Sequence, residues 1–456
     1  MKCHLRFLLP GICVLVGLGI GVRIQQSRNQ GAPPRLIETR LNPAPPGGDP
    51  CGIALAPHHG NEKIDLEIER LQGEARSGAN SAECMKRLGW AFITKARLSY
   101  DPGYYKLAEQ CASCAQSKNA HDPDALLLQG HIFQSLHRFK EAERIARRLL
   151  TIRGEASDYG LLGDVLMEQG QLTDAAVAYQ KMINARPDPQ AYARVAHLRW
   201  LKGDLEGAIE VMRMAVTAGS PNEPEPTAWC YTRLGLYELQ LGEMKSAAKS
   251  AATALEFADN YAAALLLNGR ILLVEGDTGE ALKSLRHAAT LTLLPEYQWM
   301  LADALREAGE FQAAEEAESK LISRGATTDP RTFALYLATR GRQTQEALKL
   351  AEDELHTRTD VFTMDAVAWA LKANGRLQEA QEYSRKALSE GTQDARLFYH
   401  AGCIALALND YADAQKSFVR AESIDQMLMP LERVDLAKQF AAARNSEKPD
   451  AVARSN

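Results

Sequence analysis

Residues 158–187 read DYGLLGDVLMEQGQLTDAAVAYQKMINARP, and this stretch decides the fold that the sequence predicts. Gly163 lies in the apolar stripe of a first helical segment, and Gly170 marks a turn after it. Ala175 lies in the stripe of a second helical segment, which Pro187 ends because proline cannot continue a helix. The stretch therefore predicts a helix, a turn and a second helix.

The same spacing recurs along most of the chain. Positions equivalent to Gly163 follow one another at 33 or 34 residues, apart from steps of 41 and 39, and nine of the ten are small. Two helices stack closely where a small residue lets their backbones approach, so ten stacked helix pairs are expected. The first set of positions is Gly89, Gly130, Gly163, Ala196, Gly235, Gly269, Ala302, Leu335, Ala368 and Gly402. The second set is alanine throughout: Ala108, Ala142, Ala175, Ala208, Ala247, Ala281, Ala314, Ala347, Ala380 and Ala414.

Leu-Gly, an alanine twelve residues after the glycine, an aromatic residue and a closing proline together resemble the tetratricopeptide repeat, whose period is about 34 residues. The resemblance implies an all-α fold, a right-handed α-solenoid of about ten helix-turn-helix repeats. The array is expected at residues 82–429, after a capping helix region at 61–81 and before a capping helix at 430–444. The segments YHAG and DAVAWAL also resemble parts of large exported bacterial proteins of this family, whose role is not established.

The first 23 residues have the layout of an export signal. Lys2 and Arg6 precede sixteen uncharged, mostly apolar residues, which is slightly short for a membrane span. The segment is either a cleaved signal peptide or an uncleaved signal anchor. We therefore expect the repeats outside the cytoplasm, in the periplasm or on the extracytoplasmic face, with membrane contact only through this segment.

The segments that flank the array have their own composition. Residues 24–60 are rich in proline and glycine, which predicts a linker without helix. Residues 445–456 are polar and predict a disordered tail.

Two insertions interrupt the period. Residues 99–105 predict an extra loop between the two helices of the first repeat, and residues 219–226 predict a loop between repeats four and five. Such loops either shape a binding face or are tolerated surface, and we favour tolerance. Cys111 and Cys114 share the spacing of redox and zinc sites, but they lie inside a predicted helix, which favours a packing role.

The net charge and the absence of known catalytic motifs exclude several classes of function. The net charge of −5 and the lack of a basic stripe with interleaved aromatic residues exclude nucleic acid as the expected partner. The sequence has no phosphate-binding loop, no H-E-x-x-H and no G-x-S-x-G, so we expect no enzyme, no cofactor and no metal. The alternative is an all-helical toroid-type enzyme with Asp164, Asp303 and Asp365 as its acids and bases.

The resemblance implies a non-catalytic scaffold or adaptor that binds a protein or peptide partner. In this family the first helix of each pair lines a concave groove, where aromatic and charged side chains recognise peptides. We expect Trp299 and Trp369 to be the main apolar anchors, although tryptophans that fill gaps between helices are the alternative. The implied groove residues are His197, Trp200, Arg270, Trp299, Asp303, Arg306, Tyr336, Asp365, Trp369 and Tyr399.

Overall fold

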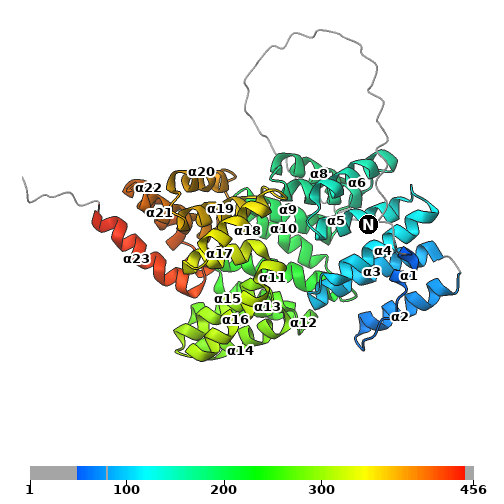
Figure 1. The fold of residues 1–456 in the computed structure, drawn as a ribbon, viewed down its shortest axis with the longest axis horizontal. Helices are drawn as coiled ribbons and strands as arrows, with labels where there is room; N and C mark the ends of the chain where they lie inside the picture. The colour runs from blue at the N-terminus through cyan, green and yellow to red at the C-terminus, as the bar shows by residue number, and fades with distance from the viewer. Residues whose placement is uncertain (1–48, 79–80, 447–456) are drawn as a thin grey trace, which may run out of the picture. The chain divides into compact units, whose positions relative to one another are not determined.

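The computed structural model describes residues 49–78 and 81–446 of the chain. The predicted export signal, most of the predicted linker and residues 447–456 of the tail lie outside this part. Within it the chain is helical and forms no strand, and Figure 1 shows the helices in order. The elements are α1 (Pro50–Ala54), α2 (Lys63–Arg76), α3 (Ser81–Ser99), α4 (Gly103–Lys118), α5 (Pro123–Ser135), α6 (Phe139–Ile152), α7 (Ala156–Glu168), α8 (Leu172–Ala185), α9 (Pro189–Leu201), α10 (Leu205–Thr217), α11 (Pro224–Gln240), α12 (Met244–Phe257), α13 (Ala262–Glu275), α14 (Thr278–Leu291), α15 (Pro295–Glu307), α16 (Phe311–Thr328), α17 (Pro330–Arg340), α18 (Thr344–Leu355), α19 (Val361–Ala373), α20 (Leu377–Leu388), α21 (Ala395–Ala407), α22 (Tyr411–Glu422), the 3-10 helix η1 (Asp425–Met427) and α23 (Pro430–Ser446).

Helices α3 to α22 form ten consecutive pairs, one for each predicted repeat, so the predicted all-α solenoid is confirmed. The ten alanines of the second helices are all fully buried. At Gly163 a Cβ atom would overlap the ring of Tyr179, and at Gly402 it would overlap the ring of Phe418. The small residues of the pattern therefore lie where two helices pack face to face.

The turns of repeats three to five contact loops much later in the chain. Gln169 O accepts a hydrogen bond from Thr359 Oγ1 at 2.7 Å, and Leu201 O accepts one from Thr392 Oγ1 at 2.5 Å. In repeat five, the side-chain amide of Gln426 donates to two backbone carbonyls at 3.0 Å each. These three contacts join residues 186 to 191 positions apart, which is between five and six repeat periods. We call this line of contacts the seam, formed by residues 168–170, 201–203 and 239–240 with residues 358–360, 390–393 and 426–428.

Both predicted insertions are shorter as loops than expected. The structure corrects the loop at 99–105, because α3 continues to Ser99 and α4 begins at Gly103, whose N–H donates to Asp101 Oδ1 at 2.8 Å. The extra residues mainly lengthen helices, since most of them have ordinary helix propensity. Residues 224–226 of the second insertion begin α11 in the same way.

The insertions also contact other repeats. Arg97 at the end of α3 forms an ion pair of 3.1 Å with Glu225 in the second insertion. Tyr100 packs edge-on against Tyr297 of α15, with ring centroids 6.5 Å apart. The first repeat therefore contacts repeats five and seven, and these segments are not merely tolerated surface.

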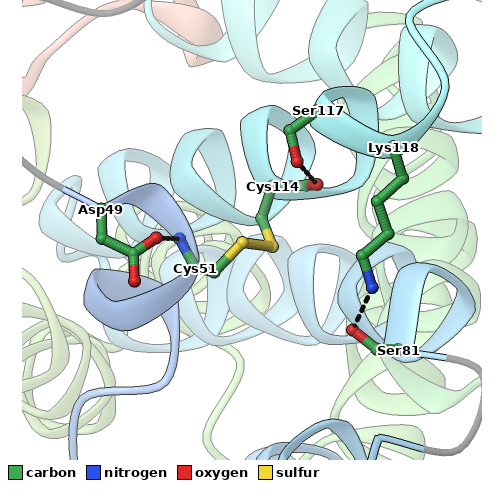
Figure 2. The surroundings of a disulfide bond; sticks show 6 residues. All are labelled: Asp49, Cys51, Ser81, Cys114, Ser117 and Lys118. Atoms are coloured by element: carbon green, nitrogen blue, oxygen red, sulfur yellow. Dashed lines mark hydrogen bonds between the residues drawn. A yellow bond between two sulfur atoms is a disulfide. The ribbon is translucent and has the colours of Figure 1, made fainter.

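The N-terminal segment differs from the prediction at two points. Residues 50–54, inside the predicted helix-free linker, form α1 because Asp49 accepts a hydrogen bond from the Cys51 N–H and a proline fits the first helical position. Figure 2 shows that Cys51 forms a disulfide with Cys114 of α4, where the sequence favoured a packing role. Cys111 remains a buried free thiol. The disulfide spans 63 residues, and a loop of that length contributes about 4 kcal/mol to stability.

Helix α23 covers α15, α21 and α22 at the C-terminal end of the array. Its buried side chains include Leu436 and Phe440. Its polar side meets α21, since Tyr399 Oη donates to Asp435 Oδ2 at 2.7 Å. A segment of the chain itself therefore occupies part of the surface that the sequence assigned to a partner.

Candidate functional site

A cavity of about 500 Å³ lies between the first helices of repeats three to five and those of repeats eight to ten. Its lining comes mainly from α7, α9 and α11 on one side and from α17, α19 and α21 on the other, with single residues from α8, α15 and α20. The seam forms part of its wall, since Gly170, Thr359 and Glu390 belong to the lining. Protein cavities that hold ligands measure about 300–1,000 Å³, so this space is large enough for one.

Trp200 forms the centre of an aromatic wall. Its ring stacks on Phe362 from repeat nine with centroids 5.8 Å apart, on His197 at 5.4 Å and on Tyr237 at 5.9 Å. Its indole N–H donates to Gln240 Oε1 at 2.8 Å. Each such aromatic pair contributes about 0.5–1.5 kcal/mol beyond its area, so the wall is held in place from three sides.

Charged pairs lie beside the aromatic wall. Arg331 Nη1 lies 3.1 Å from Asp360 Oδ1, and Arg358 Nη1 lies 3.5 Å from Glu168 Oε2. Burial, followed by the charge of Asp360, raises the pKa of Glu168 above its ordinary value. The seam therefore includes a carboxylate whose charged form is less favourable in the folded chain than in water.

His197 and Arg233 lie together at the Trp200 end of the cavity. Arg233 Nη2 donates to His197 Nδ1 at 3.0 Å and to Tyr237 Oη at 3.2 Å. Burial and the positive charge of Arg233 lower the pKa of His197 to about 3. His197 is therefore neutral near pH 7, and Arg233 is the cation at this end.

Asp365 lines the cavity from α19. Its carboxylate lies 2.9 Å from His400 Nδ1, and the His400 ring stacks on Trp369 with centroids 3.9 Å apart. His400 is fully buried, and its Nε2 has no hydrogen-bond partner within the described residues. The pair holds the Asp365 carboxylate in a fixed position against the cavity.

Of the ten predicted groove residues, the structure brings His197, Trp200 and Asp365 together around the cavity. Arg270 instead donates to the backbone carbonyls of the segment between α22 and α23, including Leu428 O at 3.4 Å. Burial lowers the pKa of Arg270, as expected for a cation removed from water.

The other four predicted aromatic residues lie in the packed interior. Trp299 and Tyr336 are fully buried and meet edge to face at 5.5 Å, while Tyr399 is 2% exposed beneath α23. Trp369 is 4% exposed and donates from its indole N–H to Thr339 Oγ1 at 2.9 Å. Neighbouring helices cover Trp299 and Trp369. Both side chains therefore fill gaps between helices, which is the alternative to a role as apolar anchors.

The remaining two predicted residues belong to a charge network of repeats seven and eight. Asp303 is fully buried and pairs with Arg340, and burial raises the pKa of Asp303 to about 6. Arg306 Nη2 lies 2.6 Å from Glu318 Oε2. The other carboxylate oxygen of Glu318, Oε1, lies 3.2 Å from Arg340 Nη2. These side chains pair within the array and do not line the cavity.

Sequence reasoning missed Arg233 and Phe362. Arg233 lies two residues before Gly235, a position that the resemblance does not assign to the groove. Phe362 reaches Trp200 because repeat four lies against repeat nine, and a local period does not reveal such a contact.

The described residues, 49–78 and 81–446, offer neither a metal site nor a membrane-spanning helix. No three His, Cys, Asp or Glu side chains there lie close enough to hold a metal ion together. None of the helices in that part of the chain combines the length and the apolar character needed to cross a membrane.

Comparisons with known proteins agree with the repeat pattern. Two sequence profiles described as tetratricopeptide repeat match the chain, one at residues 161–224 and 266–330 and the other at residues 395–426. No curated protein matches the sequence. The profile matches and the ten helix pairs support a protein built of tetratricopeptide repeats, and proteins with such repeats generally mediate protein interactions.

Several solved structures are similar in part. YrrB, a protein of this family with an unusual peptide-binding site, is 16% identical over 40% of this chain and 92% of that chain, with a TM-score of 0.29. A thermophilic member from Thermus thermophilus is 20% identical over 42% of this chain and 99% of that chain, with a TM-score of 0.37. The human IFIT1 dimer with PPP-AAAA is 15% identical over 71% of this chain and 77% of that chain, with a TM-score of 0.45.

Proposed function

We propose, on the premise that the chain is a tetratricopeptide repeat protein, that it is a non-catalytic scaffold which holds a segment of a partner protein in its cavity. The observation that carries the proposal is the lining, which joins an aromatic wall around Trp200 to charged side chains of both signs. An aromatic surface binds an apolar side chain of the partner, and fixed charges orient its polar groups. Three of the sequence-predicted groove residues, His197, Trp200 and Asp365, contribute to this lining.

The contacts of the acidic residues favour a scaffold over a toroid-type enzyme. Asp164 accepts hydrogen bonds at 2.8 Å from Tyr179 Oη and from Arg194 Nε and Nη2. Asp303 pairs with Arg340, and Asp365 pairs with a fully buried histidine. General acid–base catalysis needs a carboxyl group that can reach a substrate proton, whereas these carboxylates are each engaged by neighbouring side chains.

We further propose that the array works outside the cytoplasm, in the bacterial cell envelope. The disulfide between Cys51 and Cys114 supports this location, because structural disulfides persist mainly in oxidising compartments. The export-signal layout of the first 23 residues supports it independently. Protease added to intact spheroplasts should digest the repeats, and protection until lysis would contradict the location.

Site-specific photo-cross-linking in cells tests the binding site. A photoreactive phenylalanine analogue replaces Phe362, which lines the cavity, or Phe311, which is 61% exposed and lies outside it. The analogue changes the size of either side chain little, so the two proteins are matched. We expect a discrete adduct with an envelope protein from position 362 and none from position 311. Adducts from position 311 alone would place the partner on the outer surface and refute the cavity as the site.

A further inference from the structure

We infer that the cavity recognises a carboxylate of the bound segment and that Arg233 is the residue that pairs with it. This inference rests on the proposed function and adds the chemical class of the group that is bound. It begins from one arginine of the lining that lacks a carboxylate partner within the described residues.

The other arginines of the lining already have a carboxylate. Arg331 pairs with Asp360 at 3.1 Å, Arg358 with Glu354 at 3.0 Å, and Arg396 with Glu432 at 3.1 Å. Lys386 has no such partner among the described residues, but it is exposed and therefore solvated. These cations need no ligand to balance their charge.

The carboxylates of the lining are engaged as well. Glu390 pairs with Lys202 at 2.6 Å, and Asp394 accepts from two backbone N–H groups at the start of α21 at 2.9 and 3.2 Å. Glu168, Asp360 and Asp365 pair as described above, and Glu296 lies 3.8 Å from Arg270. Within the described residues none of these carboxylates forms an ion pair with Arg233.

Among the arginines of the lining, Arg233 is the exception within the described part of the chain. Its only hydrogen-bond partners there are the neutral His197 and Tyr237, and its Nε is buried with no partner. Its guanidinium lies 5.5 Å from the Trp200 ring centroid, so it stands against the aromatic wall. Arg233 is half-buried, so its cation is only partly exposed to water. Such a cation is stabilised when an anion pairs with it, and arginine pairs well with a planar carboxylate.

His197 adds a second donor beside Arg233. Because its Nδ1 accepts from Arg233, the neutral ring carries its proton on Nε2. His197 lines the cavity, and its Nε2 is not a buried atom without a partner. The Nε2–H group can therefore donate to a group in the cavity or to solvent. A carboxylate next to Arg233 can therefore accept hydrogen bonds from both side chains while its apolar stem packs on Trp200.

The carboxylate has two possible sources in a peptide, an acidic side chain and the chain terminus. Calorimetric titration of the full-length protein distinguishes them with three probes: N-acetyl-Ala-Glu-Ala-amide, N-acetyl-Ala-Gln-Ala with a free carboxyl end, and N-acetyl-Ala-Gln-Ala-amide. We expect at least one acidic probe to bind about tenfold or more tightly than the neutral amide, as for a hydrogen bond between charged groups. Whichever acidic probe binds identifies the source.

Arg233→Gln should remove this preference, and Arg233→Lys should keep part of it because the charge remains. Lys386→Gln is the matched control, since it removes one positive charge from the same lining at an exposed position. The comparison of acidic and neutral probes on the unmodified protein needs no variant, so it stands even if a substitution impairs folding.

The inference is overturned if the neutral amide binds as tightly as both acidic probes, if no acidic probe binds, or if Lys386→Gln weakens acidic probes as much as Arg233→Gln. If all three probes bind equally and position 362 still forms the cross-link, carboxylate recognition is refuted and the proposed function stands. Absence of cross-linking from position 362 would instead remove the proposed function.

Discussion

Two kinds of turn connect the helices within the repeats, although their glycines share one backbone geometry. Gly170 and Gly203 have φ angles of 70° and 82°, and Gly276 and Gly309 have φ angles of 84° and 77°. At Gly170 a Cβ atom would lie 2.6 Å from the carbonyl oxygen of Thr359, and at Gly203 it would overlap a carbonyl of the seam in the same way. At Gly276 and Gly309 it would meet nothing within 4 Å.

The difference separates local from long-range causes. The left-handed turn that ends the first helix favours glycine whatever surrounds it, although His137 and Asn409 adopt the same conformation in repeats two and ten. In repeats three and four the same glycines also let two distant parts of the array touch. This contact brings Phe362 against Trp200 and forms part of the cavity wall, so the seam determines the candidate site as well as the fold.

The largest expected effect comes from adding one methyl group to each kind of turn. Gly276→Ala should cost about 1–2 kcal/mol, because alanine disfavours the left-handed conformation. Gly203→Ala carries the same cost and also overlaps the Gly391 carbonyl, which adds about 1–3 kcal/mol of overpacking. Urea-induced unfolding of the two variants measures the difference. Equal losses would mean that the seam does not form in solution.

A smaller effect should follow from removing one hydrogen bond of the seam. Thr392 is fully buried and donates to Leu201 O, one of the last carbonyls of α9, which has no partner within its own helix. Thr392→Val keeps the shape of the side chain and leaves that carbonyl unsatisfied, at a cost of about 1–3 kcal/mol. Thr290→Val is the control, because Thr290 is exposed and bonds within its own helix. Thermal unfolding should show a loss at Thr392 alone, and a matching loss at Thr290 would assign the effect to the substitution itself.

The sequence predicts the helix pairs well because their causes are local. Gly163 and Ala175 define a packing contact within about twelve residues, and the ring of Tyr179 fills the space that Gly163 leaves open. The same reasoning locates the turn at Gly170. Each of these features depends on neighbours within a single repeat.

The candidate site is harder to predict because its causes are not local. Whether repeat four meets repeat nine depends on small rotations that add up over five repeats, and no single repeat encodes their sum. Trp299, three residues before Ala302, holds a predicted groove position but is fully buried, whereas Trp200, four residues after Ala196, holds another and lines the cavity. The interruptions of the period were the available signal, since Arg97 and Glu225 lie in or beside them and pair across four repeats.

The smallest effect concerns Glu168 of the seam and its counterpart Glu307. Glu307 lies two residues before Gly309, where an added Cβ atom would meet nothing within 4 Å. Burial and the charge of Asp360 raise the pKa of Glu168 above 4.5 in the folded chain, so folding favours its protonated form. Its contribution to stability is therefore fully present below about pH 4.5 and is lost as the pH rises through the raised pKa. At neutral and higher pH, Glu168 should therefore contribute least to the stability of the wild-type seam.

Glu168→Gln mimics the protonated form at every pH, so the variant should melt at a higher temperature than the wild type at pH 7 and at the same temperature near pH 4. Glu307 is exposed, and Glu307→Gln should match the wild type at both pH values. Melting curves of the three proteins across this pH range measure the effect. A lower melting temperature for Glu168→Gln at pH 7 would show that the ion pair with Arg358, at 3.5 Å, outweighs burial and the repulsion from Asp360. In that case the seam would gain from the charge of Glu168, and acid would weaken it instead of strengthening it.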